Sequence, residues 1–403
     1  MIPKDLNDLS VEFFSSILSC PVASFTVEPS APFQGNTSVL HSLLVNFSSP
    51  LTFPPRRLFL KFALPTEEGN RNVSFNRQAF IDSGAYRKEV EFYKYVKDKS
   101  ELAGLVPPVY YAEIEPVGSV DHFLLVLGEA GRPLNQLEGC SIDTSRSVMS
   151  QAARLHAHFL LNPPEDNLPA ECLSPAHQLI CQIVYGPGKH SDKTPLDLLE
   201  YCSGLFEAEF EDFSHVALAM AKKAGYDLSE SLETVRSRFA DKSIISDLRI
   251  AFNHSFLSPS FRTLIHGDFR LDNMLLDESQ ESVKFIDFQA VHYGHPSYDL
   301  AQFIIQCHDD SHLIFNDLLT IYYNTLCEHA PILAAAGHLG TLEDLVVSVK
   351  AAAVFQILLL SFHLAPLKSS IDPETGLLPA SMDRFMDLIA LITKRGLISY
   401  LNL

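Results

Sequence analysis

The chain has no tryptophan and is poor in basic residues. It carries 30 Lys and Arg against 49 Asp and Glu, which gives a formal net charge of −19 over 403 residues. Nucleic acids and anionic membranes are bound through concentrated basic side chains, so this balance argues against both as partners. A neutral or cationic small molecule fits the charge more easily, although solubility alone would also account for it.

The sequence also has no long apolar run. Its most apolar stretch, residues 351–364, is interrupted by Gln356, Ser361 and His363 and is shorter than the roughly 20 residues that span a bilayer. We interpret it as a buried helix and expect no membrane span. The first eight residues contain acids where a secretion signal has a basic start, so we expect a cytoplasmic protein.

Cysteines are few, odd in number and scattered, and no pair has the spacing of metal ligands. We therefore expect reduced thiols, as in a cytosolic protein. The seven are Cys20, Cys140, Cys172, Cys181, Cys202, Cys307 and Cys327.

Length and composition allow a large core, because 47% of the residues are hydrophobic and 403 residues are enough for two lobes. Apolar periodicity predicts helices at 5–19, 86–93, 145–161, 196–223, 228–252, 310–328, 341–364 and 381–395. Alternating or apolar runs predict strands at 25–28, 38–47, 56–63, 122–127, 263–265 and 282–286.

The most informative segment reads His-Gly-Asp-Phe-Arg-Leu-Asp-Asn at 266–273 and is followed by Ile-Asp-Phe-Gln at 286–289. It places Asp268, then Asn273 five residues on, then Asp287 after a strand. A carboxylate that can take a hydroxyl proton, with two hard oxygen ligands for Mg²⁺, is a layout for phosphoryl transfer from a nucleotide. The order and spacing therefore predict a phosphotransferase.

These motifs resemble those of the aminoglycoside phosphotransferase and choline kinase-like family, in a style closest to its ecdysteroid kinase-like branch. The chain has His-Gly-Asp where protein kinases have His-Arg-Asp, and Asp-Phe-Gln where they have Asp-Phe-Gly. The resemblance runs from about residue 30 to 305. It implies a two-lobed α+β fold of the protein kinase-like type, with an antiparallel sheet and one key helix in the small lobe and a mostly helical large lobe. It also implies ATP and Mg²⁺ as cofactors.

The resemblance assigns roles within the catalytic motifs. Asp268 would orient the acceptor hydroxyl and take its proton, while Asn273 and Asp287 would bind the metal. Arg270 would reach the transferred phosphoryl oxygens, or it is simply a solvated arginine. We expect His266 to be a packed support of the loop rather than a base.

Two further aspartates have structural interpretations. Asp272 would only cap the loop. Asp299 lies where a helix begins, so its first interpretation is a carboxylate that satisfies the backbone donors of that helix. In the resembling family the matching aspartate steadies the catalytic loop.

A lysine in an apolar strand suggests the nucleotide site. Lys61 lies within the strand expected at 56–63, where a charge is costly unless it is paired. Glu89, on the helix expected at 86–93, is the candidate partner, and Glu91 is its rival. Lys61 would then bind the α- and β-phosphates. The alternative is a lysine at a strand edge and a solvated glutamate.

The turn around Gly35, between the strands expected at 25–28 and 38–47, lies over the phosphates in the resembling family. Gly35, Asn36 and Ser38 would approach them there. An ordinary hairpin turn would look the same.

The strand at 122–127 leads to the boundary between the lobes. Backbone groups near Leu127 and Glu129 would bond the adenine edge, and ATP and GTP are not distinguished. We expect a small nucleotide-binding lobe at 1–128 and a large catalytic lobe at 129–403.

A helical insertion at 163–262 would form the acceptor site, because the small-molecule kinases of the resembling family use such helices for it. Its residues could surround an apolar acceptor or attract a cationic one: Phe206, Phe210, Phe213 and Tyr226, or Glu207, Glu209, Glu211 and Asp212. Only twelve positions separate Asp287 from Asp299, which leaves no room for the activation segment of a protein kinase.

The predicted function is transfer of the terminal phosphoryl group of ATP to a hydroxyl of a small molecule, by a monomer or homodimer. Hydroxylated steroids, alkaloids, choline-like alcohols and aminoglycosides all remain open as acceptors. The alternative is a nucleotide-binding scaffold or sensor of the same fold that has lost transfer.

Overall fold

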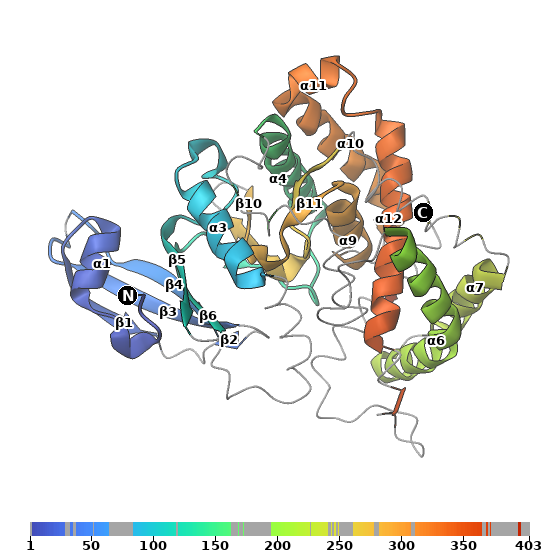
Figure 1. The fold of residues 1–403 in the computed structure, drawn as a ribbon, viewed down its shortest axis with the longest axis horizontal. Helices are drawn as coiled ribbons and strands as arrows, with labels where there is room; N and C mark the ends of the chain where they lie inside the picture. Colours follow the sequence, from blue (N-terminus) through green and yellow to red (C-terminus); the bar gives the residue numbers. More distant parts are fainter. Residues whose placement is uncertain are drawn as a thin grey trace.

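An antiparallel sheet lies at one end of the molecule and a group of helices at the other, with α3 between them (Figure 1). The computed structural model describes residues 2–28, 33–34, 38–50, 52–63, 84–117, 120–162, 168, 172, 195–225, 227–240, 243, 246, 249, 261–277, 282–307, 311–364, 368–369, 371 and 394–395.

The strands are β1 (Val22–Val27), β2 (Phe33–Gln34), β3 (Ser38–Phe47), β4 (Arg56–Ala63), β5 (Val109–Val117), β6 (Val120–Gly128), β7 (Arg132–Pro133), β8 (Thr263–Ile265), β9 (Met274–Asp277), β10 (Ser282–Phe285) and β11 (His292–Gly294). The α-helices are α1 (Val11–Leu18), α3 (Ala85–Lys97), α4 (Ile142–Leu161), α6 (Pro195–Ala224), α7 (Ser229–Ala240), α9 (Ser297–Cys307), α10 (Ser311–His329), α11 (Pro331–Ala335) and α12 (Leu342–Leu364). The short 3₁₀ helices are η1 (Leu6–Asp8), η2 (Ser100–Leu102), η5 (Leu271–Asn273) and η6 (Phe288–Ala290).

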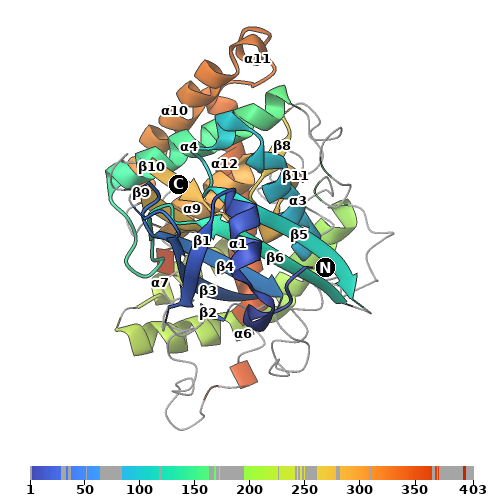
Figure 2. The ribbon, with the colours of Figure 1, turned by 90° about the vertical axis from the view of Figure 1, so that its left-hand side faces the viewer.

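The large sheet has the strand order β1-β3-β4-β6-β5, and β2 pairs with β3 (Figure 2). All of its pairings are antiparallel. Two small sheets, β10-β9-β7 and β11-β8, carry the segments that contain the catalytic motifs. The predicted mixed α+β fold, with an antiparallel sheet and a helical remainder, is confirmed.

The two faces of the large sheet explain where Lys61 points. Side chains alternate along a strand, so Leu60 and Phe62 of β4 face one way and Lys61 the other. Leu60 and Phe62 are buried in one cluster with Phe14 of α1. Lys61 is therefore directed to the opposite face, where α3 lies.

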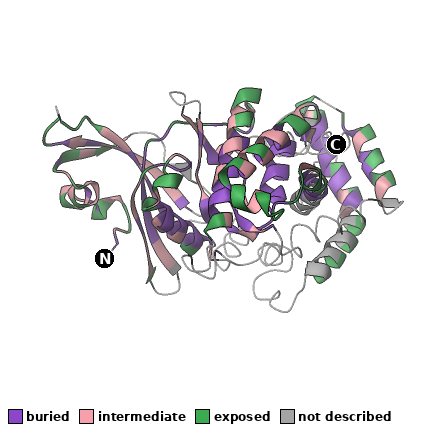
Figure 3. Cartoon of the chain, turned by 90° about the horizontal axis from the view of Figure 1, so that it is seen from above, coloured by how far each residue is buried: buried purple, intermediate pink, exposed green. Residues whose placement is uncertain are grey.

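Helix α3 belongs to the same core as the helical part of the molecule. Its residues Tyr86, Val90 and Tyr93 recur at helical spacing and are buried, as predicted. They share one cluster with residues of α4, α9, α10 and the strands β8, β9 and β10. Figure 3 shows this buried core running through the centre of the molecule.

Several predicted boundaries were wrong. The first helix is two elements, because the Ser10 hydroxyl accepts from Phe13 N and starts α1 after a break at Leu9. The strand predicted at 25–28 begins at Val22, and β2, β5, β7, β9 and β11 were not predicted. Most of the helix expected at 381–395 lies outside the described residues.

Within the described part of the chain, Cys20, Cys140, Cys172, Cys307 and Cys327 are not joined in disulfides. None of the described helices combines the length and apolar character that crossing a membrane requires.

Candidate active site

The loop after β8 is built around a glycine. Gly267 has φ +81°, and a Cβ added there would lie 2.2 Å from the carbonyl oxygen of Ala290. Both the left-handed backbone and the close approach require glycine. This accounts for Gly rather than Arg in the His-Gly-Asp motif.

Asp299, in the first turn of α9, anchors this loop. It is fully buried and accepts hydrogen bonds from His266 N at 2.7 Å and Gly267 N at 2.9 Å. Its carboxylate thus satisfies donors of the loop, which corrects the first interpretation as a cap of its own helix. Burial opposes its ionisation, but hydrogen bonding from His156 and the charge of His266 lower the pKa of Asp299 below the ordinary value.

His266 supports the loop, as expected. It is fully buried, its Nε2 lies 2.8 Å from the carbonyl oxygen of Ile286, and its ring packs on Phe288 with centroids 4.6 Å apart. Ile286 N in turn donates to Asn273 O at 3.0 Å. His266 therefore connects the two motifs that the sequence separates.

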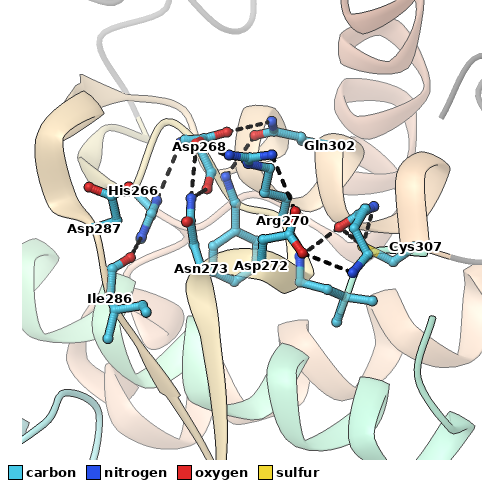
Figure 4. A network of polar contacts seen from close by, with 12 residues as sticks. His266, Asp268, Arg270, Asp272, Asn273, Ile286, Asp287, Gln302 and Cys307 are labelled. Carbon is cyan, nitrogen blue, oxygen red and sulfur yellow. Dashed lines mark hydrogen bonds and ion pairs between the residues drawn. The ribbon is translucent and has the colours of Figure 1, made fainter. Parts of the chain in front are cut away.

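The Asp268 carboxylate is held by three side chains (Figure 4). Its Oδ2 accepts from Arg270 Nε at 3.1 Å and Asn273 Nδ2 at 2.9 Å, and its Oδ1 accepts from Gln302 Nε2 at 3.3 Å. Burial opposes ionisation, but the charges of Arg270 and His266 and the bond from Asn273 lower the pKa of Asp268. The lowered pKa keeps this carboxylate ionised at neutral pH, and because its side chain is 35% exposed it can be reached from solvent.

Arg270 is ion-paired rather than simply solvated. Its Nη1 lies 3.4 Å from Asp272 Oδ2, in addition to its contact with Asp268. The charge of Asp268 is the main cause that raises the pKa of Arg270. Asp272 Oδ1 accepts from Gln136 N at 3.0 Å, so Asp272 ties the loop to the segment after β7.

The two expected metal ligands, Asn273 and Asp287, are held in different ways. Asn273 uses Nδ2 to donate to the backbone oxygen of Asp268 at 2.8 Å and to its carboxylate, which leaves Oδ1 as the oxygen suited to a cation. Asp287 follows β10 with φ +66°, a conformation costly for a residue with a side chain. Its carboxylate is 36% exposed.

Lys61, Glu89 and Asp287 form one ion cluster. Lys61 Nζ lies 2.8 and 2.9 Å from the two Glu89 oxygens and 2.7 Å from Asp287 Oδ1. Glu91 instead pairs with Lys94 at 3.3 Å, so Glu89 is the partner of Lys61. Burial alone would lower the pKa of Lys61, but the carboxylates of Asp287 and Glu89 raise it above the ordinary lysine value.

Glu89 has a further partner, Gln289, whose Nε2 donates to its Oε2 at 3.1 Å. Glu89 is 1% exposed, and this burial raises its pKa to about 7 against the opposing effect of Lys61. Next to Gln289, the Phe288 ring stacks on Phe92 of α3 with centroids 3.7 Å apart. The Asp-Phe-Gln motif therefore holds α3 in place.

The remaining residues expected to contact the nucleotide are either outside the described residues, buried, or paired within the protein. Gly35 and Asn36 lie outside the described residues, and Ser38 is buried at the start of β3. Leu127 is buried, whereas the Glu129 carboxylate pairs with Arg57 at 2.7 Å.

The backbone around the expected adenine position also has partners. Gly128 N donates to Pro108 O at 2.8 Å and Glu129 N donates to Arg57 O at 3.3 Å. These two amides are engaged inside the protein, so other backbone groups would have to meet the base.

Within the expected acceptor insertion, Phe210 and Phe213 of α6 are buried, and the Arg236 guanidinium lies 5.7 Å from the Phe210 ring centroid. Tyr226 and the side chain of Phe206 lie outside the described residues. The acids of α6 are partly or fully exposed at Glu207, Glu209, Glu211 and Asp212.

Sequence reasoning missed three buried glutamines, Gln136, Gln289 and Gln302. Gln302 follows Asp299 by three residues, so both lie on one face of α9, and this spacing was a usable signal. Gln289 stands within a recognised motif. Gln136, which accepts from Leu271 N at 2.8 Å, gave no local signal.

Among the described residues, no group of three or more His, Cys, Asp or Glu side chains is placed to hold a metal ion. The site does fit a cation shared with phosphates. Among the described residues, the carboxylates of Asp268, Asp272, Asp287 and Glu89 form ion pairs with Lys61 and Arg270. Asn273 and Asp287 add the hard oxygen atoms that Mg²⁺ prefers.

The chain is similar in sequence to the ecdysteroid kinase-like family, which matches residues 189–334. This match contains the catalytic loop and Asp287 but not Lys61 or Glu89. It begins and ends later than the span of about 30–305 expected from the motifs. No curated protein matches the chain in sequence.

In structure the chain is similar to small-molecule kinases over most of its length. A microcompartment-associated aminopropanol kinase is 15% identical, with 97% of this chain and 98% of that chain covered and a TM-score of 0.47. A choline kinase from Cryptosporidium parvum Iowa II is 14% identical, with 94% and 88% covered and a TM-score of 0.45. A GDP complex of an aminoglycoside 2′-phosphotransferase is 13% identical, with 94% and 96% covered and a TM-score of 0.43.

Proposed function

We propose that the chain is an ATP- and Mg²⁺-dependent phosphotransferase that acts on a hydroxyl of a small molecule. The observation that carries the proposal is the ion cluster of Lys61, Glu89 and Asp287 beside the loop of Asp268. A buried lysine held by a glutamate on a neighbouring helix, opposite a carboxylate after a strand, is the arrangement that kinases use for nucleotide phosphates.

In the proposed reaction the acceptor oxygen forms a bond to the γ-phosphorus of ATP, and the bond from that phosphorus to the β–γ bridging oxygen breaks. The products are a phosphate monoester and ADP. Asp268 orients the hydroxyl and receives its proton. Its low pKa makes it a weak base, which suits a loose transition state where the proton leaves late.

The charged side chains have separate parts in this reaction. Lys61, fixed by Glu89, binds the α- and β-phosphates. Arg270 gives up a contact with a neighbouring carboxylate and binds the oxygens of the transferred phosphoryl group instead. Mg²⁺, held by Asn273 Oδ1 and Asp287, would supply positive charge beside the phosphates.

We keep the remaining assignments as parts of the proposal. Gly35, Asn36 and Ser38 cover the phosphates, and backbone near Leu127 and Glu129 meets the base. Residues 1–128 form the nucleotide-binding lobe, 129–403 the catalytic lobe, and 163–262 the acceptor site. The acceptor is a hydroxylated steroid, alkaloid, choline-like alcohol or aminoglycoside, and the protein works in the cytoplasm as a monomer or homodimer.

Titration calorimetry with Mg-ATP tests the metal assignment. Asp287→Ala removes a direct ligand and is expected to weaken Mg-ATP binding by about tenfold or more, a loss of about 1.4 kcal/mol. Asp143→Ala, whose side chain is 91% exposed on α4, is the matched control and is expected to bind as the wild type does. Equal affinity in Asp287→Ala and the wild type would contradict the assignment.

A further inference from the structure

Gln302 of α9 touches the catalytic loop with both ends of its side-chain amide. Its Oε1 accepts from the Phe269 backbone N–H at 2.7 Å, and its Nε2 donates to Asp268 Oδ1 at 3.3 Å. The residue is 8% exposed, and Figure 4 shows it beside the Asp268 carboxylate. One buried amide thus connects the loop backbone to its reactive side chain.

The Phe269 contact fixes how this amide is turned. A backbone N–H can only donate, so the amide oxygen faces Phe269 and the amide nitrogen faces Asp268. Arg270 and Asn273 both donate to the other carboxylate oxygen, Oδ2. Within the described part of the chain, Gln302 is the side chain that donates to Oδ1.

Without the donor at Oδ1, the hydrogen bonds described above would hold the Asp268 carboxylate through Oδ2 alone, and its plane could rotate more freely. The torsion that turns an aspartate carboxylate has broad, shallow minima, so side-chain packing alone defines it poorly. A reacting group that is displaced by about 1 Å can lose about 10²-fold in rate. The hydrogen bond from Gln302 therefore limits the orientation in which the Asp268 carboxylate faces an acceptor hydroxyl.

We infer that Gln302 is a positioning residue for phosphoryl transfer, which holds the Asp268 carboxylate in the orientation that receives the acceptor hydroxyl. This inference rests on the proposed function. Gln302 is buried, and its side chain contacts the Phe269 backbone and Asp268. Its effect is expected in turnover and not in the binding of Mg-ATP.

Two substitutions separate this role from simple support of the loop. Gln302→Glu, assayed at a pH high enough to ionise the introduced carboxyl group, keeps an oxygen for the Phe269 N–H but replaces the donor to Asp268 with a second carboxylate oxygen. Gln302→Leu removes both contacts. Hydrolysis of Mg-ATP, with water as the acceptor, measures turnover, and calorimetry measures the Mg-ATP dissociation constant.

We expect both variants to lose about 10–100-fold in turnover while the dissociation constant hardly changes. If Gln302→Glu turned over like the wild type and only Gln302→Leu were impaired, Gln302 would merely support the Phe269 backbone. The inference would then be overturned.

Gln306 provides the matched control. It lies one turn further along α9 and is 6% exposed, and its backbone oxygen, rather than its side chain, meets Gln136 at 2.7 Å. Gln306→Glu buries a carboxylate in the same helix and is expected to lower the melting temperature as Gln302→Glu does. Below that temperature its turnover is expected to match the wild type. An equal loss of turnover in Gln306→Glu would contradict a specific role for Gln302.

An exchange of the two groups tests the contact without any reaction. Asp268→Asn combined with Gln302→Glu restores an amide-to-carboxylate hydrogen bond with donor and acceptor reversed. We expect the double variant to melt at a higher temperature than Gln302→Glu alone, while turnover stays lost. No recovery of stability would overturn the contact. If the wild type neither hydrolysed Mg-ATP nor phosphorylated an acceptor, the proposed function would be wrong. The melting temperatures would still test the contact between Gln302 and Asp268.

Discussion

At the scale of single residues, the catalytic loop depends on a glycine whose φ is +81° and whose added Cβ would lie 2.2 Å from Ala290 O. Gly267→Ala is expected to destabilise the protein by about 2–4 kcal/mol, because strain and steric overlap add. Gly204→Ala, in the helix α6 with nothing within 4 Å, is expected to be neutral or to stabilise by about 0.5–1 kcal/mol. Denaturant unfolding of both variants measures this, and equal stabilities would contradict the account.

The charged side chains and the asparagine of the candidate site could be picked out from sequence because their signals are local. Asp268, Asn273 and Asp287 stand within two short motifs, and Lys61 drew attention as a charge in an apolar strand. The amides that hold them could not be predicted in the same way. Gln289 reaches Glu89 across 200 residues of chain, a contact that only the folded structure creates.

At the scale of elements, β4, α3 and the segment after β10 meet at one ion cluster. Lys61→Ala and Glu89→Ala are each expected to lower turnover by about 10–100-fold, because both disturb the same lysine position. The double variant is expected to be little worse than either single one, since paired residues act as a unit. Steady-state turnover of Mg-ATP measures all three.

Glu91→Ala is the control for this cycle, because Glu91 is on α3 but pairs with Lys94. It is expected to keep wild-type turnover. Losses that add in the Lys61 and Glu89 double variant would show that these residues act independently.

Long apolar helices were predicted within a few residues, as for α10 and α12, because apolar residues sustained over several turns are a strong signal. The short strands β7, β9 and β11 were missed. Each has two to four residues. β8 and β10 are as short but were recognised because their apolar or alternating residues stand next to the two motifs.

At the scale of the whole molecule, stability is expected to depend on a histidine that is buried neutral. Burial lowers the pKa of His292 to about 4, with Lys88 and His266 adding to the effect and Asp299 and the Ala290 carbonyl opposing it. The unfolded chain has an ordinary histidine pKa of about 6.5. Its contribution to stability is therefore complete above about pH 6.5 and is lost as the pH falls towards about 4.

His292→Phe removes this titration while keeping a ring of similar size. Its melting temperature is expected to fall less steeply than that of the wild type between about pH 7 and pH 5. Thermal unfolding at several pH values measures the difference. Parallel curves for the two proteins would mean that His292 does not titrate as described.

The central claim is that this site transfers a phosphoryl group to a hydroxyl. The most direct measurement incubates the protein with Mg-ATP and a library of hydroxylated steroids, alkaloids, choline-like alcohols and aminoglycosides, and detects by mass any compound that gains one phosphoryl group. We predict at least one such product with the wild type, and turnover about 10²–10⁴-fold lower with Asp268→Asn at unchanged Mg-ATP affinity. A protein that binds Mg-ATP but phosphorylates nothing, or an Asp268→Asn variant as active as the wild type, would contradict the account.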